Sequence, residues 1–284
     1  MKLHLIDGTY ELFRQHFGAR RGRSSRNGGL VGLAHTLTAL LRQDDVTHVG
    51  VAFDHVIESF RNDLFDGYKT GAGLPEELTS QFHPAEDLCR ALGVVVWPMV
   101  DFEADDALGT AAARFRDQVD QVVIGTPDKD MAQCVVGDRV VLWDRMRKIV
   151  YDEDAVREKW GVAPASIPDW LALVGDSADG IPGIPRWGAK GAATVLARYG
   201  RIEDIPTDPA TWDVKVRGAK GLSENLEPRR TDALLYKTLA TLRTDAPVPQ
   251  TLDELRWTGA RPELRELLAE LGQERLVERI PAWA

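Results

Sequence analysis

Cysteine is scarce in this sequence, and long apolar runs are missing. The chain has two cysteines among 284 residues, Cys89 and Cys134, which are too few for a disulfide framework and lack the spacing of a metal-binding pair. No run of about 18 apolar residues occurs, which excludes a membrane-spanning helix. The apolar stretch at the N-terminus is too short for a signal peptide. These absences predict a soluble, cytoplasmic protein with reduced thiols.

An excess of positive charge is also missing. Asp and Glu number 44 against 35 Lys and Arg, so the formal net charge is −9, which excludes a uniformly cationic nucleic-acid-binding surface. Hydrophobic residues make up 44% of the chain and no low-complexity tract occurs. The chain is therefore not disordered and can bury a sizeable core.

The first half of the chain alternates strand-like and helix-like segments. Short apolar runs typical of buried strands lie at 3–7, 48–54, 94–97, 121–126 and 140–143. Helical periodicity occurs between them, at 29–42, 84–92 and 103–115. This alternation predicts an α/β fold with a mostly parallel central sheet flanked by helices.

After about Tyr151 the pattern becomes mostly helical. Helices are predicted at 152–160, 166–174, 188–199, 228–242 and 262–271, with glycine and proline at the joins. Residues 245–262 lack this periodicity, and their large apolar side chains need cover, so we expect an extended segment that crosses the fold. We therefore expect an α/β core over 1–160 and a mostly helical part over 161–284.

Acidic residues follow four successive predicted strands. Because the carboxyl ends of parallel strands meet at one edge, where ligands bind, seven carboxylates are expected to lie together: Asp7, Asp54, Glu103, Asp105, Asp106, Asp128 and Asp130. Two charges about 4 Å apart repel by about 4 kcal/mol at an effective dielectric constant of about 20, so such a cluster needs protons or divalent cations. A role in capping a helix can explain a single acid after a strand. It does not explain why acids follow four successive strands. Oxygen ligands favour Mg²⁺ or Mn²⁺.

The same residues lie in motifs that resemble those of the 5′ nuclease family, which includes the N-terminal nuclease domain of bacterial DNA polymerase I, phage 5′ exonucleases and flap endonucleases. The motifs occur in family order: LIDG at 5–8, FD at 53–54, SFR at 59–61, GYK at 67–69, EADD at 103–106, TPDKD at 126–130 and GDSADGIPG at 175–183. The resemblance implies a PIN-like nuclease core with a helical arch over about 66–82. It also implies a DNA-binding helix–turn–helix over about 166–200.

The resemblance also implies a set of site residues. It adds Asp176 and Asp179, whose loop alone would indicate only a polar turn, to the seven acids, and it implies that all nine hold two or more Mg²⁺ or Mn²⁺ ions. It further implies that Arg61 and Lys69 lie above the metals, where they can stabilise charge on the scissile phosphate. Taken alone, each of these two residues would indicate a solvated surface charge.

Basic residues are segregated into two tracts without acids, at 12–43 and 180–202, which predicts phosphate contacts there. The predicted DNA contacts are Arg14, Arg20, Arg21, Arg23, Arg26, Tyr68, Gly183, Arg186, Gly188 and Lys190. Tyr68 fits base stacking as well as it fits packing within the helical gateway, the segment above the metals that carries Arg61 and Lys69. At 183–188 the sequence GIPRWG stands where the family usually has GVKGIG, so Arg186 replaces a flexible glycine. We expect this turn to bind a phosphate and K⁺.

Together these features predict a divalent-metal-dependent 5′ nuclease, with 5′–3′ exonuclease and flap endonuclease activity, that hydrolyses DNA by a two-metal mechanism in replication or repair. We expect a monomer that acts on DNA with a 5′ flap, a nick or a 5′ end, without a membrane partner. Two alternatives stay open: a PIN-class ribonuclease and a non-catalytic binder of branched DNA. The sequence fits either a stand-alone enzyme or an excised nuclease domain.

Overall fold

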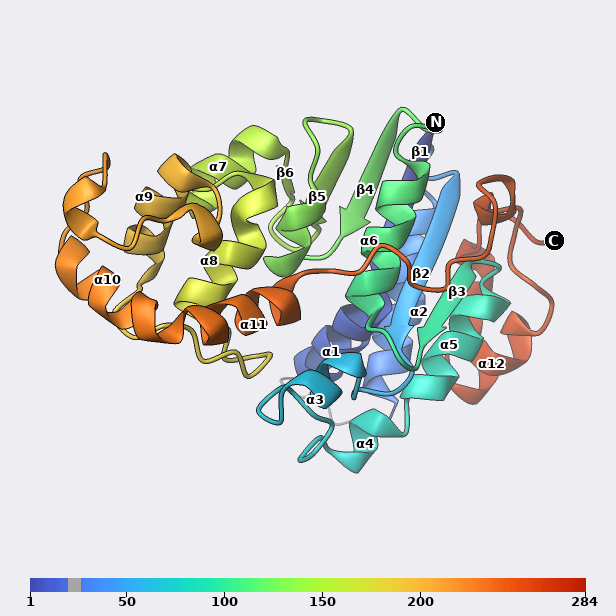
Figure 1. Ribbon diagram of the computed structural model, residues 1–284. Coiled ribbons are helices and arrows are strands. Elements are labelled where there is room, and N and C mark those ends of the chain that lie inside the picture. The colour runs from blue at the N-terminus through green and yellow to red at the C-terminus, as the bar shows by residue number, and fades with distance from the viewer. Residues whose placement is uncertain (20–26) are drawn as a thin grey trace. The chain divides into compact units, whose positions relative to one another are not determined.

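The computed structural model (Figure 1) describes residues 1–19 and 27–284, which pack as two compact units. Unit 1 comprises residues 1–59, 71–126 and 243–284, and unit 2 comprises residues 60–70 and 127–242. The chain therefore passes between the units several times. A domain boundary at residue 160 stays a prediction.

Unit 1 is built on four parallel strands in the order β3-β2-β1-β4, namely β3 (Val95–Met99), β2 (His48–Asp54), β1 (Lys2–Asp7) and β4 (Gln121–Gly125). In the register, Leu5 of β1 lies opposite Gly50 of β2 and Ile124 of β4. The chain adds β2 and β3 on one side of β1 and then β4 on the other. Parallel α/β sheets bind ligands beyond the carboxyl ends of the strands at such a reversal.

The centre of this sheet is apolar on both faces. Leu3, Leu5 and Ile6 of β1 are fully buried, as expected for a parallel strand covered on both sides. Gly50 makes room for Trp97, because a Cβ atom at this position would lie 2.3 Å from the indole ring. Trp97 Nε1 in turn donates a hydrogen bond to Gln250 Oε1 at 2.8 Å, which ties the C-terminal segment to β3.

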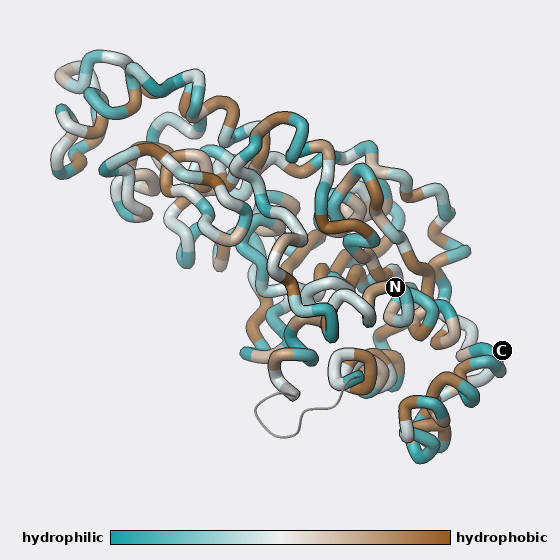
Figure 2. Tube along the Cα trace, turned by 90° about the horizontal axis from the view of Figure 1, so that it is seen from below, coloured by the Kyte–Doolittle hydropathy of each residue, from teal (hydrophilic) through white to brown (hydrophobic). Residues whose placement is uncertain are grey.

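The helices of unit 1 are α1 (Gly8–Ala19), α2 (Gly28–Leu41), α4 (Glu76–Thr79), α5 (Phe82–Ala91), α6 (Ala104–Phe115) and α12 (Leu264–Glu270). Helix α6 packs on all four strands, while α1, α2 and α5 pack on one another (Figure 1). The trace alternates between apolar and polar stretches along the helices (Figure 2), as expected where one helix face is buried. Helices α1 and α4 were not among the helices predicted from the sequence.

The segment predicted to cross the fold lies along unit 1 with little regular structure apart from η6 (Asp253–Leu255). The backbone N–H of Trp257 donates to Thr47 O at 2.9 Å, and its indole N–H donates to Leu92 O at 2.8 Å. Leu255 is buried. The expected cover for these apolar side chains is therefore confirmed. The turn η7 (Glu274–Arg279) follows α12.

Unit 2 contains an antiparallel strand pair, β5 (Val140–Asp144) and β6 (Ile149–Tyr151), with Leu142 opposite Tyr151. Its helices are α3 (Phe60–Leu64), α7 (Glu153–Trp160), α8 (Ile167–Val174), α9 (Ala189–Tyr199), α10 (Ala219–Leu226) and α11 (Arg230–Ala240). Helix α8 contacts both α9 and α11. Shorter turns are η1 (Asp130–Cys134), η2 (Pro164–Ser166), η3 (Ile202–Asp204), η4 (Pro209–Thr211) and η5 (Glu227–Arg229).

Helix α7 illustrates how local sequence sets the boundaries. Asp152 caps its start by accepting a hydrogen bond from Ala155 N at 2.9 Å. Gly161 ends it with a φ of 75°, a left-handed conformation that favours glycine. The predicted fold class, a mostly parallel sheet flanked by helices with a helical C-terminal part, is confirmed. Among the described residues, no helix is both long and apolar enough to cross a membrane.

Candidate metal centre and nucleic-acid interface

Asp7 and Asp54 end neighbouring strands of unit 1 at the same edge of the sheet. Asp7 lies opposite Ala52 in the register of β1 and β2, and Asp54 follows two residues later. The backbone N–H of Asp54 donates to Thr9 Oγ1 at 2.8 Å, and the N–H of Ala104 donates to Asp54 Oδ1 at 2.7 Å. Asp54 therefore lies at the N-terminus of α6, where the helix dipole favours negative charge.

The buried carboxylate of Asp7 accepts hydrogen bonds at both oxygens. Tyr10 N donates to Oδ1 at 2.8 Å and so caps the first turn of α1. Thr126 Oγ1, just beyond the end of β4, donates to Oδ2 at 3.1 Å. A carboxylate oxygen can accept more than one partner, so the helix-capping role of Asp7 is compatible with metal ligation.

The three acids at the start of α6 have different surroundings. Glu103 and Asp106 form a capping box, in which Glu103 N donates to Asp106 Oδ2 at 3.0 Å. Glu103 Oε1 also accepts from Ser59 Oγ at 2.8 Å. Asp106 is 0% exposed, and its Oδ1 accepts the N–H of Arg243 at 2.8 Å, whereas Asp105 is partly exposed. Asp106 is thus placed to orient Glu103 and anchor the C-terminal segment.

Unit 2 carries a second group of carboxylates. One oxygen atom each of Asp130, Asp176 and Asp179 lie within 4.8 Å of one another. Asp130 begins η1, and the other two lie in the loop after α8. Asp128 adjoins this trio because its Oδ1 accepts the backbone N–H of Asp130 at 3.0 Å. Unit 2 therefore brings together the four acids Asp128, Asp130, Asp176 and Asp179.

The loop after α8 is held in shape by backbone bonds and close packing. Asp176 and Ile181 exchange two backbone hydrogen bonds of 2.8 Å. Gly180 has a φ of 76°, and a Cβ atom there would lie 2.1 Å from Gly67 O. Only glycine fits this approach. The contact places Lys69 beside the loop, and the backbone N–H of Lys69 donates to Asp179 O at 3.0 Å.

Burial and mutual repulsion govern the ionisation of these acids. Burial raises the pKa of Asp130 well above its usual value, and the nearby Asp128 and Asp179 raise it further. Burial likewise raises the pKa of Asp128. Burial opposes the ionisation of Asp179 as well, but the charge and hydrogen bond of Lys69 hold the pKa of Asp179 below its usual range. The group thus contains at least one carboxyl for which ionisation is unfavourable without a further cation.

Two lysines partly neutralise this group. Lys69 Nζ lies 2.9 Å from Asp179 Oδ1. Lys129, which the sequence analysis did not single out, pairs with Asp176 Oδ2, and its Nζ lies 3.6 Å from Asp130 Oδ1. In the described residues, Asp130 Oδ1 is buried without a hydrogen-bond partner. A buried oxygen in this situation, within an all-oxygen donor set, fits a hard divalent cation such as Mg²⁺ or Mn²⁺.

Arg61 is not a surface charge in this structure. It is 1% exposed, and its guanidinium group donates from Nε to Leu239 O at 2.7 Å and from Nη2 to Thr241 O at 3.2 Å. These carbonyls end α11, where a cation is favoured by the helix dipole. The geometry therefore places Arg61 as a brace between α3 and the end of α11, and its contact with a phosphate stays a prediction.

Tyr68 is also inside the protein. Its side chain is 4% exposed, with Lys69 Nζ 5.7 Å from the ring centroid. A ring without a free face offers no surface to a base. Of the two interpretations that the sequence left open, packing within the gateway is therefore the one the geometry favours.

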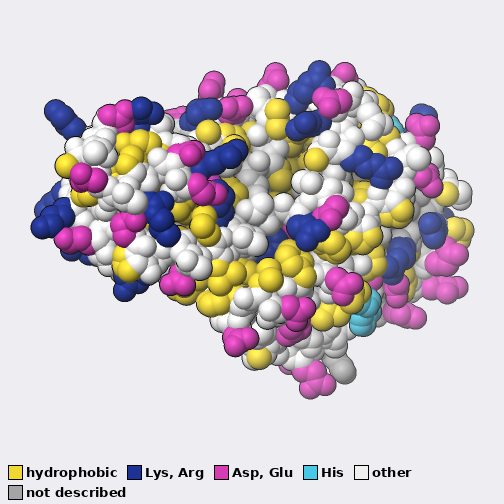
Figure 3. All heavy atoms as spheres, viewed as in Figure 1, with side chains coloured by type: hydrophobic (Ala, Val, Ile, Leu, Met, Phe, Trp, Pro, Cys, Tyr) yellow, Lys and Arg dark blue, Asp and Glu magenta, His cyan; other side chains and the backbone are white. Residues whose placement is uncertain are grey.

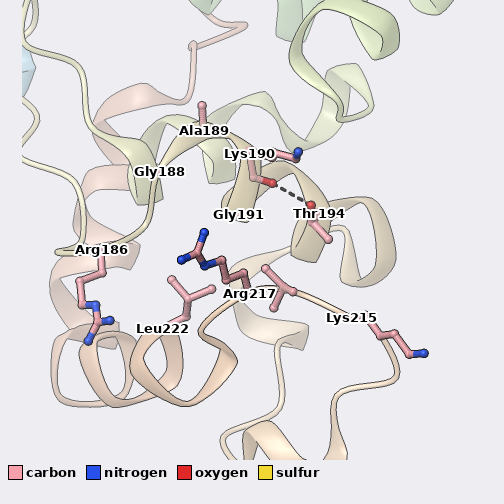
Figure 4. A pocket seen from close by; sticks show the side chains of 10 residues that line it. Arg186, Gly188, Ala189, Lys190, Gly191, Thr194, Lys215, Arg217 and Leu222 are labelled. Atoms are coloured by element: carbon pink, nitrogen blue, oxygen red, sulfur yellow. Dashed lines mark hydrogen bonds between the residues drawn. The ribbon is translucent and has the colours of Figure 1, made fainter.

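The turn between α8 and α9 borders a pocket with several basic side chains (Figure 4). Arg186, Gly188 and Lys190, all predicted DNA contacts, line it. Lys215 and Arg217 also line it, and Figure 4 shows the guanidinium group of Arg217 pointing toward the middle. Neither residue was among the predicted DNA contacts, because both lie beyond the acid-free tract, although their alternate spacing is visible in the sequence.

Backbone geometry explains part of the unusual sequence of this turn. Arg186 has a φ of 72°, a left-handed conformation that costs a residue with a side chain about 1–2 kcal/mol. Gly183, also with a positive φ, leaves no space for a side chain, since a Cβ atom would lie 2.6 Å from Gly175 N. The neighbouring Trp187 is buried and donates from Nε1 to Leu222 O at 3.0 Å. This anchor holds Arg186 in place.

The other predicted DNA contacts receive less support. Arg14 is paired with Glu11 on α1. Four further predicted contacts lie outside the described residues: Arg20, Arg21, Arg23 and Arg26. On the face shown in Figure 3, acidic and basic side chains are interspersed. Arg198, in the second acid-free tract of the sequence, pairs with Asp213. A basic residue in such a tract can therefore still be neutralised by an acid from elsewhere in the chain.

Two family models match the chain. The first, described as the N-terminal resolvase-like domain of 5′–3′ exonuclease, matches residues 2–161, and the second, described as the C-terminal SAM fold of 5′–3′ exonuclease, matches residues 162–263. Among curated proteins, a 5′–3′ exonuclease of Buchnera aphidicola is 32% identical over 84% of this chain and 80% of its own length. DNA polymerase I of Bacillus caldotenax is 34% identical over 98% of this chain. The chain spans 32% of the length of that polymerase.

Solved structures share the fold. A structure of T5 5′-exonuclease with bound divalent metal ions (zinc) matches 98% of this chain and 97% of its own, with a TM-score of 0.71 and 18% identity. The catalytic core of Rad2 in complex with DNA substrate matches 98% of this chain and 92% of its own, with a TM-score of 0.65 and 14% identity. On the strength of the two family models, which together span almost the whole sequence, the chain belongs to the 5′–3′ exonuclease family.

Proposed function

We propose that this chain is a divalent-metal-dependent 5′ nuclease that hydrolyses DNA phosphodiester bonds, with 5′–3′ exonuclease and flap endonuclease activity in replication or repair. The observation that carries the proposal is the trio of Asp130, Asp176 and Asp179, with oxygens within 4.8 Å of one another. Membership of a family of 5′–3′ exonucleases, which are hydrolases, supports the reaction class.

The proposal assigns nine carboxylates as ligands of two or more Mg²⁺ or Mn²⁺ ions: Asp7, Asp54, Glu103, Asp105, Asp106, Asp128, Asp130, Asp176 and Asp179. When bound, such ions supply Lewis acidity for the attack of water on phosphorus and for the departure of the leaving oxygen. Two contacts within the units support this assignment: Thr126 donates to Asp7 Oδ2 in unit 1, and the N–H of Asp130 donates to Asp128 Oδ1 in unit 2. Within this set, Asp106 acts through the capping box that orients Glu103.

Lys69 is the side chain best placed to respond to a phosphate. Its Nζ lies 2.9 Å from Asp179 Oδ1, and the side chain is 26% exposed. If Asp179 held a metal ion, the ammonium group of Lys69 would be available to pair with a non-bridging phosphate oxygen, where it would stabilise the charge that develops during hydrolysis. The backbone bond of Lys69 to Asp179 O keeps it beside the loop throughout.

Lys69→Ala is expected to slow cleavage of a 5′-flap duplex by about tenfold or more, because the developing charge on the phosphate loses its cationic partner. In Mg²⁺ the free energy of unfolding should change little, because the proposed metal ion neutralises Asp179 in place of Lys69. Single-turnover cleavage and thermal melting measure the two effects. Lys69→Arg, which keeps the charge, is the matched control and should retain more activity. If Lys69→Ala cleaved DNA at the wild-type rate, Lys69 would have no role in catalysis and would be only a solvated surface charge.

We further propose that the basic pocket beside α9 binds the DNA backbone. The proposed substrates are DNA molecules that carry a 5′ flap, a nick or a 5′ end. We also propose that the protein acts as a monomer. The exposed Arg186, Lys190, Lys215 and Arg217 lie around this pocket near the N-terminus of α9, and backbone N–H groups at a helix N-terminus favour phosphate. The proposal includes a K⁺ ion at the turn 183–188, which the family resemblance implies.

Arg217→Ala is expected to weaken binding to duplex DNA for all sequences alike. Loss of one phosphate contact should reduce the slope of log K against log salt concentration by about 0.9. Fluorescence anisotropy over a salt series measures both quantities. The control is Arg275→Ala, which removes an exposed arginine from η7 in unit 1. If the two variants had the same DNA affinity and the same salt slope, the pocket would not be part of the DNA-binding surface.

The assay that tests the function compares labelled 5′-flap, nicked and blunt DNA duplexes with single-stranded RNA of the same sequence, all with Mg²⁺. We expect DNA cleavage near the 5′ junction or end, with a 5′-phosphate on the product. Cleavage of the RNA alone would favour the PIN-class ribonuclease alternative. Tight binding of branched DNA with no cleavage of any substrate would favour the non-catalytic binder.

A further inference from the structure

A group of side chains with donor atoms suited to a metal ion lies in unit 1, separate from the nine carboxylates. His55, His83 and Glu86 each offer one ligand atom, and these atoms lie within 4.8 Å of one another. His55 follows the end of β2, where its backbone N–H donates to Met99 O at 2.9 Å. His83 and Glu86 are both on α5, and their i, i+3 spacing puts them on the same helix face.

The contacts within the group fix the carboxylate of Glu86. Glu86 is buried, and its Oε2 lies 3.0 Å from Arg90 Nη2, one turn further along α5. Its other oxygen, Oε1, lies 2.7 Å from His55 Nδ1. Arg90 thus orients the carboxylate so that Oε1 faces the histidines. Ligands of protein-bound metals are commonly held by such outer hydrogen bonds.

The histidine side of the group is open to solvent. The imidazole rings of His55 and His83 have centroids 4.3 Å apart. His55 is about one third exposed at its side chain, and His83 is exposed. In Figure 3 a histidine side chain reaches the surface over the region of α5. An ion can therefore enter from solvent and retain a water molecule beside three protein ligands.

We propose that His55, His83 and Glu86 form a site for a borderline transition-metal ion, with Zn²⁺ as the ion that its donors fit. Two imidazole nitrogens and one carboxylate oxygen are a donor set typical of Zn²⁺, whereas Mg²⁺ prefers oxygen ligands alone. The bound ion replaces the hydrogen bond between His55 and Glu86 and ties the segment after β2 to α5. This proposal does not depend on the proposed nuclease function.

The site can be tested by Zn²⁺ titration calorimetry of the full chain in a large excess of Mg²⁺, which occupies all-oxygen sites. We expect one Zn²⁺ per chain, and a rise in the melting temperature on its addition. His83→Ala removes a ligand that is exposed, so the fold is retained, and should weaken Zn²⁺ binding by at least about tenfold and abolish the rise. His35→Ala, which removes an exposed histidine from α2, is the control and should bind as wild type.

A second variant separates this site from the carboxylate centre. Asp130→Asn should leave the Zn²⁺ affinity unchanged in excess Mg²⁺. The visible absorption of Co²⁺, which reports nitrogen ligands and a low coordination number, should appear with wild type and Asp130→Asn but not with His83→Ala. The proposal is overturned if wild type binds no Zn²⁺ in excess Mg²⁺, if His83→Ala binds as wild type, or if binding is lost in Asp130→Asn instead.

Discussion

Asp130→Asn is expected to stabilise the protein in EDTA and, in Mg²⁺, to reduce cleavage of a 5′-flap duplex by at least about a hundredfold. Both effects have one cause. Asp130 is buried beside three other acids, and its Oδ1 has no hydrogen-bond partner among the described residues. An asparagine of the same shape removes a buried charge and can donate to the neighbouring carboxylates. It also removes a ligand on which the proposed metal centre depends.

The gain in stability should depend on pH in a defined direction. Because burial and the neighbouring acids raise the pKa of Asp130 in the folded protein, folding favours its protonated form. The contribution of this carboxyl to the free energy of unfolding is fully present below its pKa in the unfolded chain. It is lost as the pH rises through its pKa in the folded protein. The advantage of Asp130→Asn in the free energy of unfolding should therefore be largest near pH 8, at about 1 kcal/mol or more, and should shrink toward pH 5.

Denaturant unfolding in EDTA at both pH values measures this difference. Added Mg²⁺ should stabilise the wild type, by about 2.7 kcal/mol at a concentration one hundred times the dissociation constant, and stabilise Asp130→Asn much less. Asp138→Asn, the same change at an exposed acid of unit 2, is the matched control and should alter neither property. A variant Asp130→Asn that is less stable than wild type in EDTA and still gains stability from Mg²⁺ would contradict the assignment.

Arg61→Ala is expected to lower the free energy of unfolding by about 3 kcal/mol. The substitution removes the donors to Leu239 O and Thr241 O at the end of α11 and opens a cavity in a fully buried place. Arg61→Lys keeps the charge but not the planar set of donors, so it should lie between Arg61→Ala and wild type. Denaturant unfolding at a fixed Mg²⁺ concentration measures all three proteins.

Comparison with Lys69→Ala separates bracing from catalysis. We expect Arg61→Ala to lose stability, and to lose activity only to the extent that the structure of unit 2 is disturbed. Lys69→Ala should lose activity with little change in stability. If Arg61→Ala retained wild-type stability and lost cleavage, Arg61 would act directly on the phosphate, as the family resemblance implies. Its assignment as a structural brace would then be wrong.

Much of the fold could be predicted because the strands of unit 1 are buried on both faces. Strand β2 was expected and found at 48–54, and helix α6 was expected one residue early because Glu103 is its N-cap. Helix α10 was missed because Gly221, Ser223 and Asn225 are weak helix formers. Its helical state depends on packing, which includes the hydrogen bond from Trp187 to Leu222 O. A local pattern cannot show such a contact.

The parts of the candidate site that depend on nearby residues could be predicted from the sequence. The parts that depend on contacts between distant residues could not. Carboxylates after strands share an edge for topological reasons, and the loop with Asp176 and Asp179 is shaped by its own glycines. The burial of Arg61 depends on carbonyls about 180 residues away along the chain. The group around His55 likewise combines a strand end with a helix that follows β2 by about 30 residues. Long-range contacts of this kind leave no periodic trace in a sequence.

The most direct test of the account is the rate of 5′-flap cleavage after dialysis against EDTA, measured while Mg²⁺ is added back. We predict no cleavage in EDTA, a saturable return of activity with Mg²⁺, and no such return in Asp130→Asn at the same concentrations. Cleavage that continues undiminished in EDTA, or that returns equally in wild type and Asp130→Asn, would contradict a metal centre built on these carboxylates.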